Sequence, residues 1–217
     1  MLDAASSPDH MQALRALYAV SARRNLPAKQ VVIREGDPPT TLYLISSGSV
    51  TATLTDWHGQ EALVAMFGPG EFFGEMGMLP GSPMGRNAQV MTRTKAVILE
   101  IPYPAFIALS RDHPSLWLEL AGQLASRLRR ANRRVAAMRV MKLHDRIAYV
   151  LNELATMPDT ETLPDGRCIR VTRDELGMLT GCTRETVGRA IAEMEAEGRL
   201  RLAGRGIVLP NASAGVT

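Results

Sequence analysis

The feature that most narrows the possible folds is a pair of capped helices within residues 170–200, RVTRDELGMLTGCTRETVGRAIAEMEAEGRL. Thr172 and Glu175 have the spacing of a capping box, which predicts a helix that starts at Thr172. Gly181 predicts a left-handed end to that helix, and Thr183 predicts the cap of the next one. Two short helices joined by a tight turn that contains glycine form a helix-turn-helix.

The second of these helices has an apolar face that is expected to point inward. Val187, Ile191 and Met194 recur at helical spacing, and Gly198 predicts the end of the helix. The following segment, LRLAGRGIVLP, predicts a hairpin, or wing, around residues 203–206. The C-terminal part of the chain is therefore expected to be a winged helix-turn-helix.

The other face of the second helix carries side chains that could read DNA. Arginine can bond guanine O6 and N7 together, and glutamate can accept a hydrogen bond from cytosine N4. Residues in the first turns of a recognition helix are those that reach base edges. Ordinary surface charges are the alternative, but the two-helix frame and the wing favour DNA. The predicted DNA-binding residues are Arg173, Thr183, Arg184, Glu185, Thr186 and Arg189.

The net charge of +3 is divided unevenly along the chain. Residues 1–110 contain 8 Lys and Arg against 9 Asp and Glu, whereas residues 111–217 contain 17 against 13. A solvated surface rich in arginine could explain this division. A C-terminal half that meets a polyanion explains it as well, and agrees with the predicted helix-turn-helix.

The first half of the chain predicts an antiparallel β domain. A short amphipathic helix is expected at about residues 8–22, and after it apolar and polar residues alternate in short runs. The longest run is TLYLISSGSVTATLTDWHGQEALVAMFGPGEFFG, in which residues 56–59 predict a hairpin turn. Short strands at this spacing are typical of a sandwich or barrel, and no helix-length segments separate them as a parallel sheet would require.

A long helix is predicted over residues 112–138. Its apolar stripe consists of Leu116, Leu120, Leu124, Leu128, Ala131, Val135 and Met138. A helix of this length would extend beyond so small a β domain, so we expect a second copy of the helix to share the stripe as a parallel dimer seam. Packing of the helix on its own β domain is the alternative. The arginines at 127, 129, 130, 133 and 134 lie mostly off the stripe, where a solvated face explains most of them.

Other classes of protein are disfavoured by what the sequence lacks. His10, His58, His113 and His144 are scattered, and no nucleophile lies near a base, so an enzyme is not expected. The two cysteines have no metal-ligand spacing and suit a reducing compartment. No apolar run approaches the roughly 18 residues of a membrane helix, and no secretory signal is visible. We therefore expect a cytoplasmic protein without a metal site.

Two motifs resemble those of a known family. GCTRETVGR is close to the recognition-helix motif, and GEFFGEMG to the phosphate-binding cassette, of the bacterial cyclic AMP receptor protein (catabolite activator) family, often grouped with the fumarate–nitrate regulators. The resemblance covers about residues 26–210. It implies an α+β fold: a jelly-roll-like, cyclic-nucleotide-binding β roll over residues 1–111, a dimerisation helix over 112–140 and a winged helix-turn-helix over 141–217.

The resemblance also implies a function. It predicts a homodimeric transcription regulator that binds a two-fold symmetric DNA operator, with the family's TGTGA-like half-sites, and that recruits or blocks RNA polymerase. A cyclic nucleotide bound in the β roll would control the regulator allosterically.

The cassette at residues 70–90 is where that nucleotide is expected. Glycines let backbone amides close around a phosphate. By resemblance, Glu75 would accept the ribose 2′-hydroxyl and Arg86 would pair with the phosphate. A Glu–Arg pair that stabilises a turn is the alternative. The predicted ligand-binding residues are Gly74, Glu75, Met76, Gly77, Arg86, Asn87, Ala131 and Asn132.

Cyclic AMP is the favoured effector, although this chain departs from the family pattern. Asn87 replaces a serine, and Ala131 and Asn132 replace the Thr-Ser pair that holds the base. Cyclic di-GMP, whose two phosphates could use arginines of the long helix, is one alternative; activity without any nucleotide is another. An iron–sulfur type lacks its N-terminal cysteines, and a haem type lacks His or Cys in the cassette. Lys142 stands where the family has an acidic helix cap.

Overall fold

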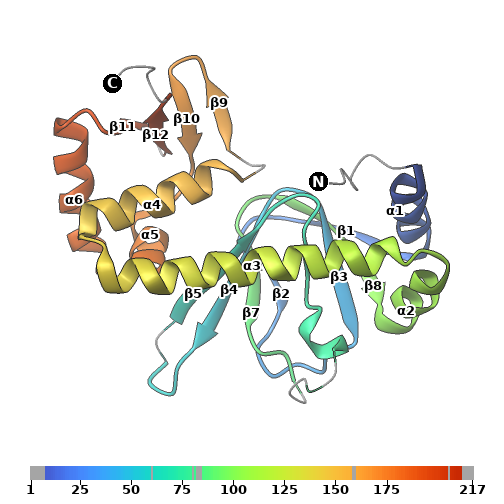
Figure 1. The fold of residues 1–217 in the computed structure, drawn as a ribbon. Helices are drawn as coiled ribbons and strands as arrows, with labels where there is room; N and C mark the ends of the chain where they lie inside the picture. Colours follow the sequence, from blue (N-terminus) through green and yellow to red (C-terminus); the bar gives the residue numbers. More distant parts are fainter. Residues whose placement is uncertain are drawn as a thin grey trace. The chain divides into compact units, whose positions relative to one another are not determined.

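The computed structural model describes residues 8–59, 61–79, 81, 85–157, 160–204 and 206–211 (Figure 1). The chain divides into two compact units between Arg129 and Arg130. The long helix α3 (Ser115–Val140) crosses this division and so contributes residues to both units. Among the described residues, no helix is both long and apolar enough to cross a membrane.

The first unit contains two four-stranded antiparallel sheets. In spatial order, one sheet consists of β1 (Ala22–Leu26), β8 (Ala96–Pro102), β3 (Thr41–Ser47) and β6 (Phe72–Phe73). The other consists of β2 (Val31–Ile33), β7 (Gln89–Thr92), β4 (Val50–Thr55) and β5 (Glu61–Phe67). The predicted β roll is confirmed, and the turn predicted at residues 56–59 connects β4 to β5.

Side chains that alternate along the first sheet build two separate cores. Tyr43 and Ile45 of β3 pack with side chains of the second sheet and form one core with them. Leu42 and Leu44 point the other way and pack with residues of three helices: α1 (Pro8–Val20), α2 (Tyr103–Asp112) and α3. The residues of β3 alternate between the two cores because successive side chains of a strand point to opposite faces of the sheet. Both faces of the sheet are covered.

The second unit is a winged helix-turn-helix, as predicted. Its helices after α3 are α4 (Leu143–Ala155), α5 (Arg173–Thr180) and α6 (Arg184–Ala196). Its antiparallel sheet has the order β11 (Arg201–Ala203), β12 (Gly206–Pro210), β10 (Gly166–Ile169) and β9 (Glu161–Leu163). Val187, Ile191 and Met194 are buried, so the predicted inner face of α6 is confirmed.

The apolar stripe predicted along α3 divides into two faces. Leu116 and Leu120 are fully buried in the core that contains α1 and α2, and Leu124 packs against that core. The prediction that these residues belong to a seam with a second helix is therefore wrong for Leu116 and Leu120. The outer face of the first sheet needs an apolar cover, and the first half of α3 supplies part of it beside α1 and α2.

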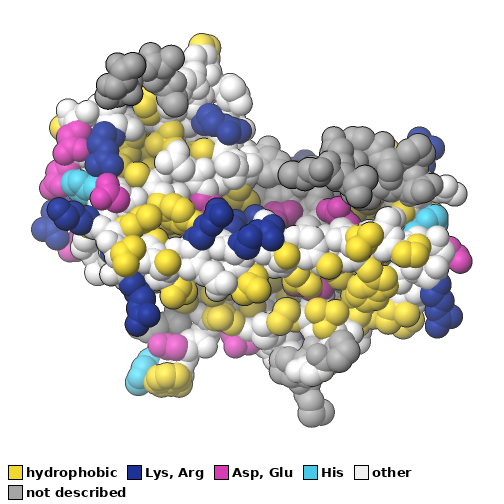
Figure 2. Space-filling model, in the orientation of Figure 1, with side chains coloured by type: hydrophobic (Ala, Val, Ile, Leu, Met, Phe, Trp, Pro, Cys, Tyr) yellow, Lys and Arg dark blue, Asp and Glu magenta, His cyan; other side chains and the backbone are white. Residues whose placement is uncertain are grey.

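A different row of residues on α3 faces solvent. Leu118, Leu128 and Val135 are 74%, 62% and 59% exposed. With Ala121, Ala125 and Asn132, which are also exposed, they recur at alternating intervals of three and four residues. We name this row, Leu118, Ala121, Ala125, Leu128, Asn132 and Val135, the exposed seam. Figure 2 shows hydrophobic side chains along the band that α3 occupies in Figure 1. This spacing is that of the apolar positions of a coiled coil.

Candidate functional site

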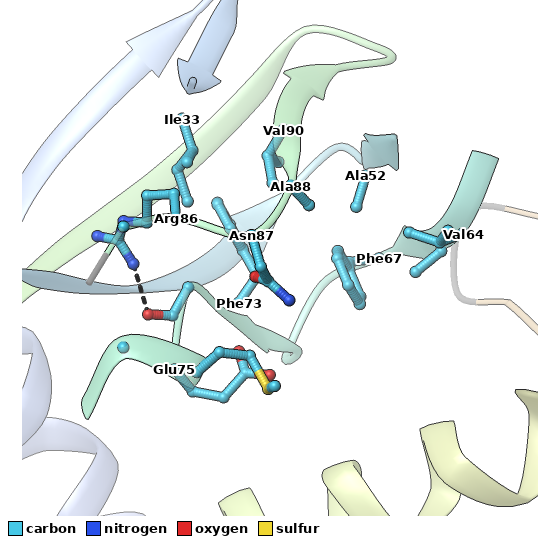
Figure 3. Close-up of a pocket in the computed structure, with 15 residues that line it drawn as sticks. Ile33, Ala52, Val64, Phe67, Phe73, Glu75, Arg86, Asn87, Ala88 and Val90 are labelled. Carbon is cyan, nitrogen blue, oxygen red and sulfur yellow. Dashed lines mark hydrogen bonds between the residues drawn. The ribbon is translucent and has the colours of Figure 1, made fainter. Parts of the chain in front are cut away.

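A cavity of about 140 Å³ opens in the first unit beside the cassette (Figure 3). Its apolar wall comes from β2, β4, β5, β6 and β7, and its polar wall from the cassette, which includes the short helix η2 (Met76–Met78). Six of the eight predicted ligand-binding residues line it: Gly74, Glu75, Met76, Gly77, Arg86 and Asn87. The other two, Ala131 and Asn132, lie on α3 in the second unit and have exposed side chains.

Arg86 is buried in the wall of this cavity and is held by neutral oxygen atoms. Its Nη1 donates to the carbonyl oxygen of Gly74 at 2.6 Å and to the Tyr103 hydroxyl at 2.9 Å. Its Nη2 donates to the carbonyl oxygen of Thr41 at 2.7 Å. The bond to Gly74 is drawn in Figure 3. Because none of these acceptors carries a full charge, they orient the guanidinium without neutralising it, and its positive charge stays at the cavity wall.

Gly74 allows this close approach. Its φ of +76° lies in the left-handed region, which side chains with a Cβ rarely adopt. A Cβ atom at this position would also lie 2.9 Å from Nη1 of Arg86 and 3.0 Å from the ring of Tyr43. A glycine is therefore needed for the carbonyl of residue 74 to reach the guanidinium.

The Tyr103 hydroxyl completes the support of Arg86. It donates to the same carbonyl oxygen of Gly74 that accepts from Arg86. Burial raises the pKa of Tyr103 above its ordinary value, and the Arg86 guanidinium opposes this shift with a smaller effect. The phenol is thus neutral at pH 7 and keeps the proton that it donates to Gly74.

Glu75 does not use Arg86 as its ion-pair partner, and the alternative that these two residues form a turn-stabilising pair is not what the structure shows. The buried Glu75 carboxylate instead pairs with Nη1 of Arg127, on α3, at 3.2 Å. Arg127 also donates to the carbonyl oxygen of Phe72 and lies over the ring of Phe67, at 4.4 Å from its centroid. The two charged residues of the cassette therefore have separate supports.

Arg127 is a site residue that the sequence analysis missed. A solvated face is expected for most of the arginines at 127–134, but Arg127, whose side chain is 14% exposed, does not lie on one. The signal was its position: Arg127 follows Leu120 and Leu124 by seven and three residues, which places it on the core-facing side of α3.

Replacement of Arg127 with leucine should destabilise the first unit strongly. Leucine keeps the apolar contact with Phe67 but leaves the Glu75 carboxylate buried without its partner, which typically costs about 3–5 kcal/mol. Both tryptophans, Trp57 and Trp117, lie in the first unit, so urea unfolding followed by tryptophan fluorescence reports on that unit.

A matched double variant tests whether the charge is the cause. Adding Glu75→Gln to Arg127→Leu removes the unpaired charge and should restore most of the lost free energy of unfolding. An Arg127→Leu variant as stable as the original chain would contradict the importance of the pair.

The caps predicted for the helix-turn-helix are present. Thr172 and Glu175 form a capping box, with bonds of 3.1 Å and 2.7 Å between each backbone N–H and the other side chain. Gly181 ends α5 with a left-handed φ of +68°. The Thr183 hydroxyl accepts from the backbone N–H of Thr186 and so caps α6. These local bonds fix the start of both helices.

Five of the six predicted DNA-binding residues lie at the starts of α5 and α6, and Arg189 lies in the second turn of α6. Arg173, Thr183, Arg184, Glu185 and Arg189 are exposed, and Thr186 is half-buried. The hydroxyl oxygens of Thr183 and Thr186 lie 2.9 Å apart. The face thus presents arginines, one glutamate and two hydroxyl groups, which are the groups that contact base edges and phosphates.

An ion pair links the end of α3 to α4. Arg134 donates through Nε and Nη2 to both carboxylate oxygens of Glu153, at 3.0 Å and 2.8 Å, and Arg130 lies 3.6 Å from the same carboxylate. Arg134 is therefore not on a solvated face, whereas the Arg130 side chain is 37% exposed, and Arg129 and Arg133 are exposed. Lys142 occupies the cap position of α4 and makes no side-chain capping bond.

Each of the two units matches a known family model. Residues 23–113 match the cyclic nucleotide-binding domain, and residues 145–214 match the Crp-like helix-turn-helix domain. The two matches cover the β roll that holds the cavity and the helices that carry the predicted DNA-binding face.

Similar proteins are known from bacteria. The chain is 36% identical, over 89% of its length and 91% of the relative's, to the cAMP-activated global transcriptional regulator Vfr of Pseudomonas aeruginosa. It is 38% identical, over 84% and 81%, to the cAMP-activated global transcriptional regulator CRP of Haemophilus influenzae. Among solved structures, the c-di-GMP responsive global regulator CLP of Xanthomonas campestris matches with a TM-score of 0.80 and 34% identity, over 93% of this chain and all of the other.

Proposed function

Because the chain belongs to the CRP/FNR family of transcription regulators, we propose that it is a homodimeric, DNA-binding regulator whose effector is cyclic AMP. The guanidinium of Arg86, which three neutral acceptors hold at the cavity wall, is the main support for cyclic AMP as the effector. A preorganised cation of this kind suits one phosphate diester. The Glu75 carboxylate, fixed by Arg127, would accept the ribose 2′-hydroxyl.

Cyclic AMP is favoured over cyclic di-GMP by the charge of the cavity wall. Among the described residues that line the cavity, Arg86 is the one basic side chain, whereas cyclic di-GMP carries two phosphates. Vfr and CRP, the curated relatives at 36% and 38% identity, are cAMP-activated. Cyclic di-GMP is the second candidate effector. The similarity to CLP and the exposed Arg129 and Arg133 on α3 favour it.

Calorimetric titration with cyclic AMP, cyclic GMP and cyclic di-GMP tests the effector. We expect cyclic AMP to bind one site per chain and to change operator affinity. Asn132→Ala should alter the preference between the two cyclic mononucleotides while leaving binding itself intact, because Asn132 would contact the base from either subunit. Tighter binding of cyclic di-GMP would replace the proposal with the second candidate, and no binding would leave a regulator that acts without a nucleotide.

The exposed seam supports the proposal of a homodimer. This solvent-facing row, which is apolar apart from Asn132 and has coiled-coil spacing, is the surface through which two copies of α3 would pack in parallel. A two-fold symmetric dimer places two recognition helices about one helical turn of DNA apart, at roughly 34 Å. The operator would then be a palindrome of TGTGA-like half-sites. Such a dimer would act at promoters in the cytoplasm, with RNA polymerase as its partner.

Replacement of Arg189 with alanine should weaken operator binding and relax one position of the half-site. Loss of a bidentate arginine–guanine contact costs about 1–3 kcal/mol. Selected-site sequencing and binding titrations on operator and random DNA measure both effects.

Thr186→Val is the matched control, because it removes a hydroxyl proposed to contact phosphate and keeps the size of the side chain. It should weaken all sequences to a similar extent. An equal loss on operator and random DNA for Arg189→Ala would show that Arg189 contacts phosphate instead of a base.

A further inference from the structure

Asp174 lies beside one of the proposed base-reading arginines. Its Oδ2 atom is 3.3 Å from Nη1 of Arg184, and the two side chains are 58% and 68% exposed. Asp174 belongs to the first turn of α5, and Arg184 is the first residue of α6. The pair therefore joins the starts of the two helices across the turn of the helix-turn-helix.

The capping of α5 fixes the backbone from which the Asp174 side chain extends. The capping box of Thr172 and Glu175 sets the first turn of α5, to which Asp174 belongs. The preceding residue, Arg173, also contacts α6: its side chain lies 3.7–3.9 Å from the position that a Cβ atom of Gly188 would occupy. Two consecutive residues of α5 thus lie against the exposed face of α6.

Stability alone does not account for the charge at position 174. An exposed ion pair contributes little to folding, about 0–1 kcal/mol, and a carboxylate in the first turn gains a similar amount from the helix dipole. A negative charge on a face that approaches phosphates opposes DNA binding in general. A carboxylate placed there reduces non-specific DNA binding. Its effect on specific binding depends on how it positions Arg184.

We propose that Asp174 is a specificity-determining residue that holds the Arg184 guanidinium in position to read a guanine. A guanidinium has five N–H donors, so it can keep the bond to Asp174 while it donates to guanine O6 and N7. Holding the side chain reduces the rotamer entropy that is lost when the base contact forms. On DNA without that guanine, the carboxylate remains near the phosphates without a compensating contact. Asp174 therefore widens the difference between operator and random DNA.

The inference rests on the proposed base readout by Arg184, and the Asp174→Asn variant tests it. Asparagine keeps the size and removes the charge. We expect affinity for random DNA to rise about threefold to tenfold, and the slope of log K against log salt to steepen by about one. In selected-site sequencing, the preference for guanine at one half-site position should fall by about fivefold or more.

Glu161→Gln is a closely matched control. Glu161 pairs with Arg170 at 3.4 Å, with side chains 55% and 71% exposed, and lies on β9 of the same unit, outside α5 and α6. This variant removes the same charge, so we expect it to leave base preference unchanged. In an Arg184→Ala background, Asp174→Asn should produce no further change in base preference.

The outcomes separate this inference from the function on which it rests. A wild-type protein that selects no motif would contradict the proposed base readout. A wild-type protein that selects a motif which Asp174→Asn retains in full would overturn the role of Asp174 alone. Equal effects of Asp174→Asn and Glu161→Gln on base preference would overturn it as well, because net charge would then be the cause. Thermal unfolding of each variant confirms that the helices remain folded.

Discussion

Replacing Leu128 and Val135 together with glutamate is expected to leave the protein monomeric and to weaken operator binding at least a hundredfold. Both side chains belong to the exposed seam, and each lies more than half exposed on the single chain. Burial of one such side chain contributes roughly 1.5–3 kcal/mol, and a symmetric dimer buries each position twice. Four carboxylates in one apolar seam would repel each other, because buried charges without partners are costly. A monomer would contact one half-site only.

Sedimentation velocity measures the assembly, and titration with a palindromic operator measures its consequence. Met11→Glu is the control, since Met11 is an exposed apolar residue on α1 and does not belong to the exposed seam. Leu124 is a poorer choice for substitution, because it packs against the core of the first unit and its loss would also damage the fold. A double variant that sediments as a dimer would show that another surface joins the copies.

Replacing Arg86 with alanine is expected to abolish measurable cyclic nucleotide binding, a loss of at least a hundredfold in affinity. The substitution removes the cation of the cavity wall, and hydrogen bonds to charged groups are about twice as strong as neutral ones. It also leaves the carbonyl oxygen of Thr41 without the Arg86 donor that it now has, whereas the carbonyl oxygen of Gly74 keeps the Tyr103 hydroxyl. Each unsatisfied buried group costs about 1–3 kcal/mol, so the variant should unfold more readily too.

Tyr103→Phe separates the two effects of Arg86→Ala. Phenylalanine removes the hydroxyl that bonds Arg86 and Gly74 but leaves the cation in place. We expect a comparable loss of stability by tryptophan fluorescence, with nucleotide binding retained by calorimetry. If Arg86→Ala binds cyclic AMP with unchanged affinity, Arg86 supports the fold of the cassette and does not bind the phosphate.

The helix-turn-helix could be predicted from the sequence because its signals are local. A capping box joins residues three positions apart, and Gly181 determines its own left-handed conformation, so neither depends on distant parts of the chain. The alternation of strands such as β3 is local in the same way. The partners of the charged residues could not be predicted as well. Glu75 and Arg127 are 52 positions apart, and only packing of α3 on the β roll brings them together.

The face of α3 was harder to predict for a related reason. Two apolar rows wind along one helix, and a single stripe drawn through both combines residues with different neighbours. Leu116 and Leu120 belong to the core of the first unit, whereas Leu128 and Val135 face solvent. Periodicity identifies the helix, but the sheet that it covers decides which row is buried.

The bond between Arg134 and Glu153 bears on where this protein can be divided. The second compact unit begins near Arg130, so the last turns of α3 belong to the same body as the helix-turn-helix. A fragment that begins at Met141, just after α3 ends, would leave the Glu153 carboxylate without the arginines that pair with it. We therefore expect a DNA-binding fragment that folds on its own to begin about a dozen residues earlier, inside a continuous helix. Exchange of effector domains between relatives would need its junction there, in mid-helix, and not in the turn before α4.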